Sequence, residues 1–246
     1  MIIKKMLNLF KSIAIILVLL LSFQKLNANE QQFNKWLTNF KEVAYQKGIS
    51  KETINSALKD AKYLKNVIVY DNRQPEFFEV TNVYISKRAN SRSLNKAKKY
   101  YKKYKNIFLK VEKEFKVEKE LILALWSIET NFGNNFGKMD IISSLATLSF
   151  DKRRSAYFTG ELLTLLSLID KKVVTKDILF GSWAGALGNF QFMPSTIDKY
   201  GIDYDQDNKI DLKYSLNDSI ASAANYLNKA GWKYNNFCFT EVNFTK

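Results

Sequence analysis

A chain of 246 residues with 46% hydrophobic and 14% aromatic side chains can bury a sizeable core, as one domain or as one domain with a lobe. Its 38 Lys and Arg against 24 Asp and Glu give a net charge of +14, which suits a polyanionic partner: nucleic acid, anionic lipid or a cell wall that carries carboxylates. The chain has no His, which excludes Ser-His and Cys-His nucleophilic systems and most zinc sites, and its single Cys238 cannot form an internal disulfide.

Residues 1–28 have the outline of a signal peptide. A basic start is followed by an apolar run at 13–23, which is short for a membrane span, and by a small residue, Ala28, at the expected cleavage site. The alternative is an uncleaved anchor, because Leu26 is a poor residue at the third position before a cut. Export of a chain without disulfides fits the bacterial periplasm.

The segment after Ala28 is predicted to begin with two helices. A second, short helix is expected from Lys51 to Ala61 with Ser50 as its N-cap, and Val67–Tyr70 is a short β-prone run. The first of the two helices precedes Lys51 and ends at Gly48. The apolar stripe of that first helix consists of Phe33, Trp36, Leu37, Phe40 and Ala44.

Residues 87–119 are dense in Lys and Arg with interleaved aromatic residues, a composition that also occurs in nucleic-acid-binding segments. However, Tyr101, Tyr104, Phe108 and Val111 recur every three or four residues. This spacing places the aromatic residues on an inward helix face and the lysines on a solvated one. We therefore expect no nucleic-acid partner.

The run Leu121–Gly137 contains the first candidate for a catalytic carboxylate. Ile122, Leu125 and Glu129 follow i, i+3, i+7 spacing, so Glu129 lies in line with an apolar stripe near the end of a helix. Partial desolvation there would raise its pKa, which suits a general acid near neutral pH. Gly133 is expected to end the helix with a left-handed cap. The spacing alone also fits a last-turn glutamate that faces water.

Seven of the nine glycines fall between 133 and 201. Gly181, Gly185 and Gly188, with Ser182 and Gln191, favour the wall of a cleft, where the backbone turns sharply or lets a ligand approach. The segment 181–191 lacks the Gly-Lys-Ser ending of a phosphate loop. Tight helix packing would explain part of the glycines but leaves a polar Gln within an apolar run unexplained.

The segment 203–214 has the spacing of an EF-hand loop, in which hard oxygen ligands bind calcium. Two positions depart from that pattern: Asn208 replaces the usual Gly, which Asn tolerates because it visits left-handed geometry, and Tyr214 cannot chelate at position 12. An acidic turn that binds nothing is the alternative. The candidate ligands at positions 1, 3, 5 and 9, and the backbone carbonyl at position 7, are Asp203, Asp205, Asp207, Asp211 and Lys209.

The chain contains several separate motifs: Glu129–Gly133, Ser144–Phe150, Arg153–Arg154, Tyr157–Leu162, Gly181–Gly188, Gln191–Ser195 and Ala223–Leu227. In this order and at this spacing, they resemble the membrane-bound lytic murein transglycosylase B family, which cleaves the glycan of bacterial peptidoglycan. The resemblance runs from about Phe33 to Trp232. It implies a lysozyme-like α+β core in a chain whose period-3.6 patterning predicts a mainly helical fold with a small β element.

The resemblance also implies roles for single residues. Glu129 would protonate the glycosidic oxygen between MurNAc and GlcNAc and then accept the proton of the MurNAc C6 hydroxyl, which yields a 1,6-anhydro end. Two arginines would hold peptide or lactyl carboxylates, and two tyrosines would face sugar rings. Ser182 and Gln191 would form hydrogen bonds near the cleaved linkage. These binding residues are Arg153, Arg154, Tyr157, Ser182, Gln191 and Tyr226. Asp218 would complete the structural calcium site, and Glu161 would be a buried structural partner rather than a second acid.

The expected organisation is a signal peptide at 1–28 and a catalytic domain at 29–246, with a helical lobe at about 30–115 and a core at about 116–232. The partners implied are peptidoglycan glycan strands, with possible cell-wall complexes, and a membrane only if the leader stays uncleaved. Relatives of the family continue well beyond the position of Trp232, where they contribute further sugar contacts. That difference leaves open a second function, a non-catalytic peptidoglycan-binding or scaffolding protein.

Overall fold

The computed structural model describes residues 29–73 and 80–236, which fall into two compact units divided after Gly48. In the first unit, a helix spans 29–46, with the Trp36 ring stacked on Phe40 at 5.2 Å, and Gly48 follows it with a φ of 87°. This agrees with the predicted helix and its left-handed end. The predicted signal peptide and Cys238 lie outside the described residues.

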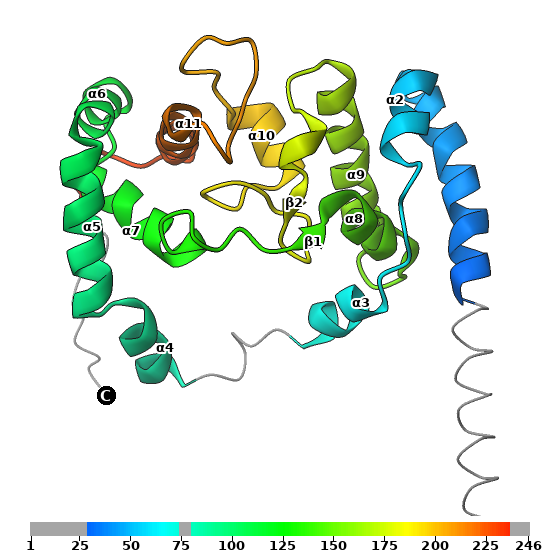
Figure 1. Ribbon diagram of the computed structural model, residues 1–246, viewed down its shortest axis with the longest axis horizontal. Helices are drawn as coiled ribbons and strands as arrows, with labels where there is room; N and C mark the ends of the chain where they lie inside the picture. The colour runs from blue at the N-terminus through cyan, green and yellow to red at the C-terminus, as the bar shows by residue number, and fades with distance from the viewer. Residues whose placement is uncertain (1–28, 74–79, 237–246) are drawn as a thin grey trace, which may run out of the picture. The chain divides into compact units, whose positions relative to one another are not determined.

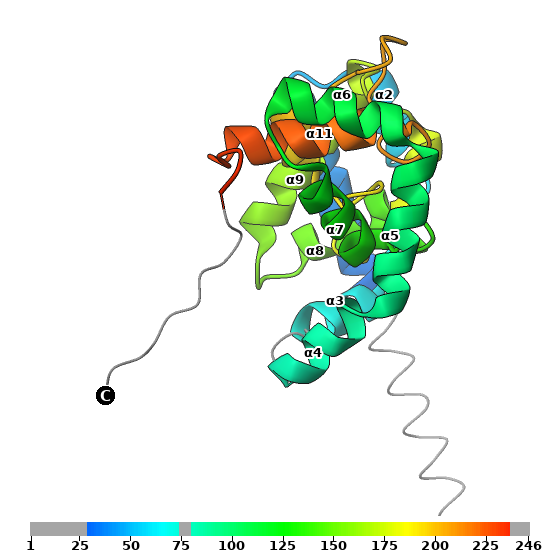
Figure 2. The same ribbon diagram turned by 90° about the vertical axis from the view of Figure 1, so that its left-hand side faces the viewer.

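The second unit is built from short helices and one small β-ladder (Figures 1 and 2). Within the described ranges, no helix combines the length and the apolar character that a membrane crossing requires. In chain order, the elements are α2 (Lys51–Ala57), α3 (Lys65–Asn72), α4 (Thr81–Arg88), α5 (Ser91–Lys103), α6 (Lys105–Phe115), α7 (Lys119–Thr130), β1 (Met139–Asp140), α8 (Ile141–Phe150), α9 (Ser155–Asp170), a 3-10 turn (Lys176–Ile178), β2 (Phe180–Gly181), α10 (Pro194–Tyr200) and α11 (Leu216–Lys229).

The β-prone run at Val67–Tyr70 is not a strand, so that prediction is wrong. It lies inside α3, which packs against α8 and buries Val67 and Asp71, four residues apart on one helix face. Packing of this face outweighs the weak β propensity of the run. The predicted helix after Ser50 is confirmed but is shorter, and the Ser50 hydroxyl accepts the Thr53 N–H as its N-cap.

The β element consists of β1 and β2, which pair antiparallel with Met139 opposite Gly181 and Asp140 opposite Phe180. Asp140 also caps α8, because its carboxylate accepts the Ser143 N–H at 2.6 Å. The ladder therefore connects the loop after α7 to the segment that leads to α10.

Helix α8 is the centre of the second unit, and every residue from Ile141 to Ser149 is buried. Helix α9 lies beside it, α3 packs on it, and α10 covers α9 (Figure 1). Two polar residues of α8 accept hydrogen bonds from the backbone that precedes α3. The Ser143 hydroxyl accepts the Lys62 N–H, and Thr147 accepts the Leu64 N–H, each at 3.0 Å.

The basic helices α5 and α6 turn their aromatic residues inward, as their spacing predicts. Phe108 and Val111 are fully buried on α6, which packs against α11, and Tyr100 on α5 stacks on Phe132 at 5.0 Å. The lysines between them form the solvated face. These helices thus support α7 and α11 from one side (Figure 2).

Candidate active site

Glu129 lies in the last turn of α7. Ile122, one of its stripe neighbours, is fully buried, whereas Glu129 itself is exposed and makes no hydrogen bond or ion pair within the described part of the chain. Even so, the protein atoms around the carboxyl group remove enough water that desolvation raises the pKa of Glu129. The predicted direction of this shift is confirmed. The result is an unpaired carboxyl group that holds its proton to a higher pH than usual and is open to a ligand.

The end of α7 differs from the prediction. Gly133 is not the cap: the helix ends at Thr130, and Asn131 and Phe132 take the left-handed conformation with φ of 50° and 61°. Asn enters this region at low cost. Phe132 is held there because its ring is buried between Tyr100 and Trp126. Aromatic packing therefore fixes where the helix of Glu129 stops.

The buried Asn189 ties this helix end to the rest of the unit. Its side-chain oxygen accepts the Trp126 indole N–H at 2.8 Å, and its backbone carbonyl accepts the Thr130 hydroxyl at 2.8 Å. Its amide group donates to the Leu212 carbonyl and to the Ser219 hydroxyl, both at 3.1 Å. Asn189 thereby joins α7, the acidic loop (203–214) and α11, and one of its partners, Thr130, directly follows Glu129 in the sequence.

The segment 181–191 forms a tight loop against the chain that follows α7. The Ser182 hydroxyl accepts the Ala186 N–H at 3.0 Å, and the Gln191 side-chain amide donates to the Gly188 carbonyl at 2.9 Å and to the Phe136 carbonyl at 3.4 Å. Gln191 has a φ of 50°, a backbone conformation that few residues other than Gly adopt. These contacts place Ser182 and Gln191 on the loop that faces the end of the Glu129 helix.

Two glycines allow this close approach. A Cβ atom on Gly137 would lie 2.1 Å from the Gly181 carbonyl oxygen, and one on Gly133 would lie 2.8 Å from the Asn189 side-chain oxygen. No side chain fits either position without a shift of the backbone or of the Asn189 side chain. Part of the glycine enrichment is therefore explained by backbone packing, the alternative considered from sequence.

Arg153 and Arg154 are committed to a protein carboxylate. Asp71 at the end of α3 is buried, and it accepts a hydrogen bond from the Arg153 Nε at 2.6 Å and another from Arg154. Arg153 also donates to the Asp71 carbonyl oxygen. The Arg153 and Arg154 side chains are 43% and 37% exposed, so part of each remains open to solvent.

Asp71 needs this pair of arginines. Burial raises the pKa of the Asp71 carboxyl, but hydrogen bonds and charge from Arg153 and Arg154 outweigh burial and hold the pKa below its usual value. The arginines thus neutralise an internal charge, which their predicted role as grips for substrate carboxylates did not include.

The predicted tyrosines lie on two different helices. Tyr157 on α9 keeps half of its surface exposed. Partial burial, together with the nearby Glu161, raises the pKa of its hydroxyl. Glu161 is 4% exposed and accepts both the N–H and the hydroxyl of Ser195. This confirms Glu161 as a structural partner. Tyr226 on α11 packs edge-on against Tyr200 and lies 5.8 Å from the Phe192 ring, next to Gln191.

The acidic loop brings part of the predicted metal set together. Carboxylate oxygens of Asp203, Asp205 and Asp218 lie within 4.8 Å of one another. Asp218 is fully buried, and burial followed by the charge of Asp205 raises its pKa, although it accepts backbone N–H groups from Tyr204 and Asp211. Convergent carboxylates with one buried member fit a hard divalent cation such as calcium.

The rest of the loop agrees only in part with EF-hand geometry. Asn208 has a φ of 70°, as its replacement of Gly requires. Asp207 accepts the Lys209 N–H at 2.9 Å and is not one of the three clustered carboxylates. Ligation by Asp207 and by the Lys209 carbonyl therefore stays a prediction.

Comparison with known proteins assigns the chain to a family. The sequence model of the transglycosylase SLT domain matches residues 32–246. The chain belongs to the transglycosylase SLT domain family. It is 32% identical over 220 residues to the membrane-bound lytic murein transglycosylase B of Escherichia coli K12, a match that covers 84% of this chain. The resemblance found in the sequence is thereby confirmed.

Solved structures of family members share the fold. SltB3 of Pseudomonas aeruginosa, in complex with NAG-NAM-pentapeptide, superposes with a TM-score of 0.80 at 31% identity over 83% of this chain. Slt35 of E. coli in complex with calcium gives 0.70 at 30% identity over 85%. The mainly helical, lysozyme-like fold is therefore confirmed. The chain spans 58% of the length of the E. coli relative, 55% of SltB3 and 66% of Slt35.

Asp71 and Asn189 were missed as site residues from the sequence. Nothing in the spacing of Asp71 predicts that an arginine pair, whose first member is 82 residues away, neutralises it. Asn189 lies between apolar neighbours, a pattern that could have marked it as a buried polar residue with several partners. Both positions depend on contacts between distant segments.

We expect Asp71→Asn to lower the free energy of unfolding by about 1–3 kcal/mol at neutral pH, because the arginines lose their charged partner but can recover water. A lowered folded-state pKa means that Asp71 stabilises the fold above the ordinary pKa of about 4 and loses this effect as the pH falls through the lowered value. The difference from wild type in urea denaturation should therefore shrink in acid. Asp60→Asn, at an exposed position, is the control. A pH-independent difference would contradict the ion pair.

Asn189→Leu keeps the size of the side chain but leaves the Trp126 indole N–H without its acceptor in a buried site. We expect the free energy of unfolding to fall by about 1–3 kcal/mol in urea denaturation. Asn228→Leu is the control, because among the described residues the Asn228 amide makes one hydrogen bond, to the Phe115 carbonyl, in a half-buried position. An equal loss of unfolding free energy in the two variants would show that the hydrogen bonds of Asn189 stabilise the fold no more than the single bond of Asn228.

Proposed function

We propose that this chain is a lytic transglycosylase that cleaves the MurNAc–GlcNAc bond of peptidoglycan and leaves 1,6-anhydro-MurNAc ends. The observation that carries the proposal is Glu129: an exposed carboxyl group without a protein partner in the described part of the chain, whose pKa is raised by desolvation. A general acid requires both properties, access to the substrate and a proton retained near the working pH.

The reaction uses the carboxyl group twice. Protonated Glu129 donates its proton to the glycosidic oxygen, the bond from that oxygen to C1 of MurNAc breaks, and positive charge develops on the sugar. The ionised Glu129 then accepts the proton of the C6 hydroxyl, whose oxygen attacks C1. No water is consumed, and Glu129 is protonated again at the end of the reaction. The C6 hydroxyl outcompetes water because it belongs to the same sugar and has a high effective concentration.

A hydrolase of this general type commonly uses a second carboxylate to activate water. The nearest candidate from sequence, Glu161, has both oxygens occupied by Ser195 and is buried. This supports the anhydro product over hydrolysis. A P. aeruginosa neighbour is known in complex with NAG-anhNAM-pentapeptide, which supports the same product class.

The binding surface is proposed to include the loop and helix residues around the Glu129 helix. Ser182 and Gln191 would bond to sugar groups near the cleaved linkage, and Tyr157 and Tyr226 would pack against sugar rings. The exposed edges of Arg153 and Arg154 would meet polar groups of the strand. We further propose that the chain acts in the periplasm, in keeping with the leader predicted at 1–28.

Calcium is proposed as a structural ion held by Asp203, Asp205 and Asp218, with Asp207 and the Lys209 carbonyl as further ligands. When bound, it would neutralise the converging carboxylates and fix the loop. This loop is joined through Leu212 to Asn189 and so to the Glu129 helix. The ion would therefore support the position of the acid without entering the chemistry.

The function is tested by Glu129→Gln against Glu120→Gln, an exposed glutamate in the first turn of the same helix. Cleavage of purified sacculi should fall by about 100-fold or more in the first variant, the lower range for loss of a general acid. It should stay at the wild-type level in the second. Wild-type cleavage by Glu129→Gln would end the proposed mechanism. Sacculus binding without cleavage by the wild type would favour the non-catalytic alternative.

The same pair of variants tests the raised pKa. The folded protein holds the Glu129 proton more tightly than the unfolded chain does, so the contribution of Glu129 to stability falls as the pH rises through the window between the two pKa values. Glu129→Gln should therefore unfold at the same or a slightly higher urea concentration than wild type at neutral pH. A clear loss of stability would assign Glu129 a structural role.

Calcium should raise the melting temperature of the wild type, because an ion that binds only the folded state stabilises it, by about 2.7 kcal/mol at a hundredfold excess over Kd. Asp205→Asn should reduce this rise, since it removes one of the three clustered carboxylates. Asp198→Asn, at an exposed position in α10, should keep it. Identical melting curves with chelator and with millimolar calcium would remove the ion from the account.

A further inference from the structure

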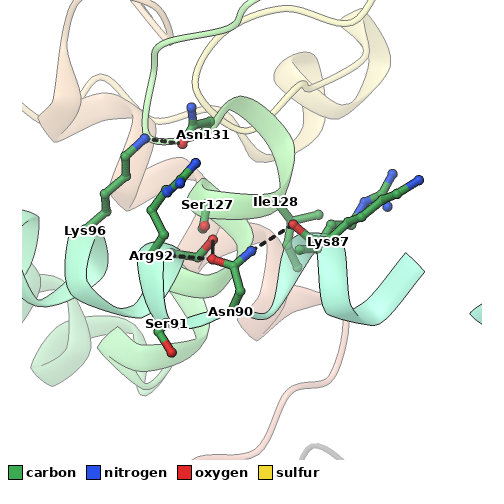
Figure 3. A pocket seen from close by; sticks show the side chains of 10 residues that line it. Lys87, Asn90, Ser91, Arg92, Lys96, Ser127, Ile128 and Asn131 are labelled. Carbon is green, nitrogen blue, oxygen red and sulfur yellow. Dashed lines mark hydrogen bonds between the residues drawn. The ribbon is translucent and has the colours of Figure 1, made fainter. Parts of the chain in front are cut away.

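A basic pocket of about 670 Å³ lies on the flank of α7 that faces α5 (Figure 3). Its cations come from the end of α4 and from α5, and no acidic residue lines it in the described part of the chain. A volume of this order suits a small ligand or a few residues of peptide. Its lining consists of Lys87, Arg88, Asn90, Ser91, Arg92, Ser93, Lys96, Ser127, Ile128 and Asn131.

Two of the cations keep unused capacity. Lys96 donates to the Asn131 side-chain oxygen at 2.9 Å, a neutral partner that uses one of three N–H groups. Arg92 is exposed and forms no ion pair or hydrogen bond with the described residues. Figure 3 shows both side chains rising from α5 toward Asn131, with Lys87 at the other end of the pocket. The α5 N-terminus is capped by Asn90, so side-chain cations supply the attraction.

The pocket is close to the proposed chemistry but separate from it. Ser127, Ile128 and Asn131 line the pocket from one side of α7, and at about 100° per residue Glu129 projects from the helix beyond Ile128, away from that side. Asn131 lines the pocket where α7 ends. A group attached to the sugar at Glu129 would have to pass around the C-terminal end of α7, past Asn131, to reach the pocket.

The two arginines at Asp71, which lie outside the pocket, help to indicate the charge of the ligand that the pocket binds. Arg153 and Arg154 both pair with the buried Asp71, whose single negative charge cancels one of their two positive charges. A substrate with several carboxylates near the cleaved bond then requires other cations. The peptide attached to MurNAc is such a group, because it is covalently bound to the sugar whose bond is broken and ends in free carboxylates.

We propose that the pocket between α4, α5 and α7 binds carboxylates of the peptide carried by the glycan strand, with Arg92 and Lys96 as the principal contacts. This inference rests on the proposed function. It assigns recognition of the peptide to a site distinct from the arginines at Asp71 and from the sugar-binding loop. Arg92 offers a planar pair of N–H groups that matches a carboxylate, and Lys96 adds a second positive charge.

The test compares full-length wild type, Arg92→Gln/Lys96→Gln and the control Lys98→Gln/Lys99→Gln, which removes equal charge from exposed positions of α5 outside the pocket. Each is assayed on glycan strands that carry peptides and on strands from which an amidase has removed them. On peptide-bearing strands, kcat/KM of the first double variant should fall about tenfold or more, the order expected for lost charge-assisted hydrogen bonds. On naked strands it should equal the wild type, and the control should match the wild type on both.

The outcomes separate this inference from the proposed function. If the wild type cleaves neither strand, the proposed function fails. If it cleaves both and the pocket variant loses equal activity on each, or none, the inference is overturned. Binding of each variant to vesicles containing an anionic lipid is measured alongside. Loss of vesicle binding with unchanged peptide dependence would assign the pocket to a membrane surface and would also overturn it.

Discussion

The hydrogen bonds of Asn189 are the constraint on which the candidate site depends. This side chain is buried, so its polar atoms require partners, and it finds them on α7, on the acidic loop and on α11. Gly133 is required beside it because a Cβ would reach its oxygen. The last turn of α7, which carries Glu129, is thereby held against the loop that carries Gln191.

The charges of the unit separate into two kinds. Asp71, Glu161 and Asp218 are buried and satisfied by arginines, a serine or backbone N–H groups, so they serve the fold or a structural ion. Glu129 and the pocket cations Arg92 and Lys96 face outward with capacity to spare. Burial of an ionised group requires compensation, and groups that lack it inside the protein are free to meet a ligand. This contrast, more than any motif, distinguishes the candidate functional residues from the structural ones.

The sequence predicted what local spacing controls. The helix ending at Gly48, the Ser50 cap, the inward Phe108 and the left-handed Asn208 all follow from patterns within a few residues. Prediction from the sequence was wrong where contacts between distant segments determine the local structure. Packing on α8 makes 67–70 helical. Phe132, held by its aromatic neighbours, ends α7 before Gly133. The pairing of Asp71 with Arg153 is of the same kind. Such contacts leave no periodic trace in one sequence, since the partners are far apart in the chain.

The central claim is that Glu129 alone moves the proton and that no water takes part. Digestion of sacculi by the wild type in ¹⁸O-labelled water, with mass spectrometry of the released fragments, tests it most directly. The account predicts anhydro-MurNAc ends without the label, because the C6 oxygen of the same sugar closes on C1. Reducing MurNAc ends that carry the label as the main product would mean that water attacks C1, and would contradict the account.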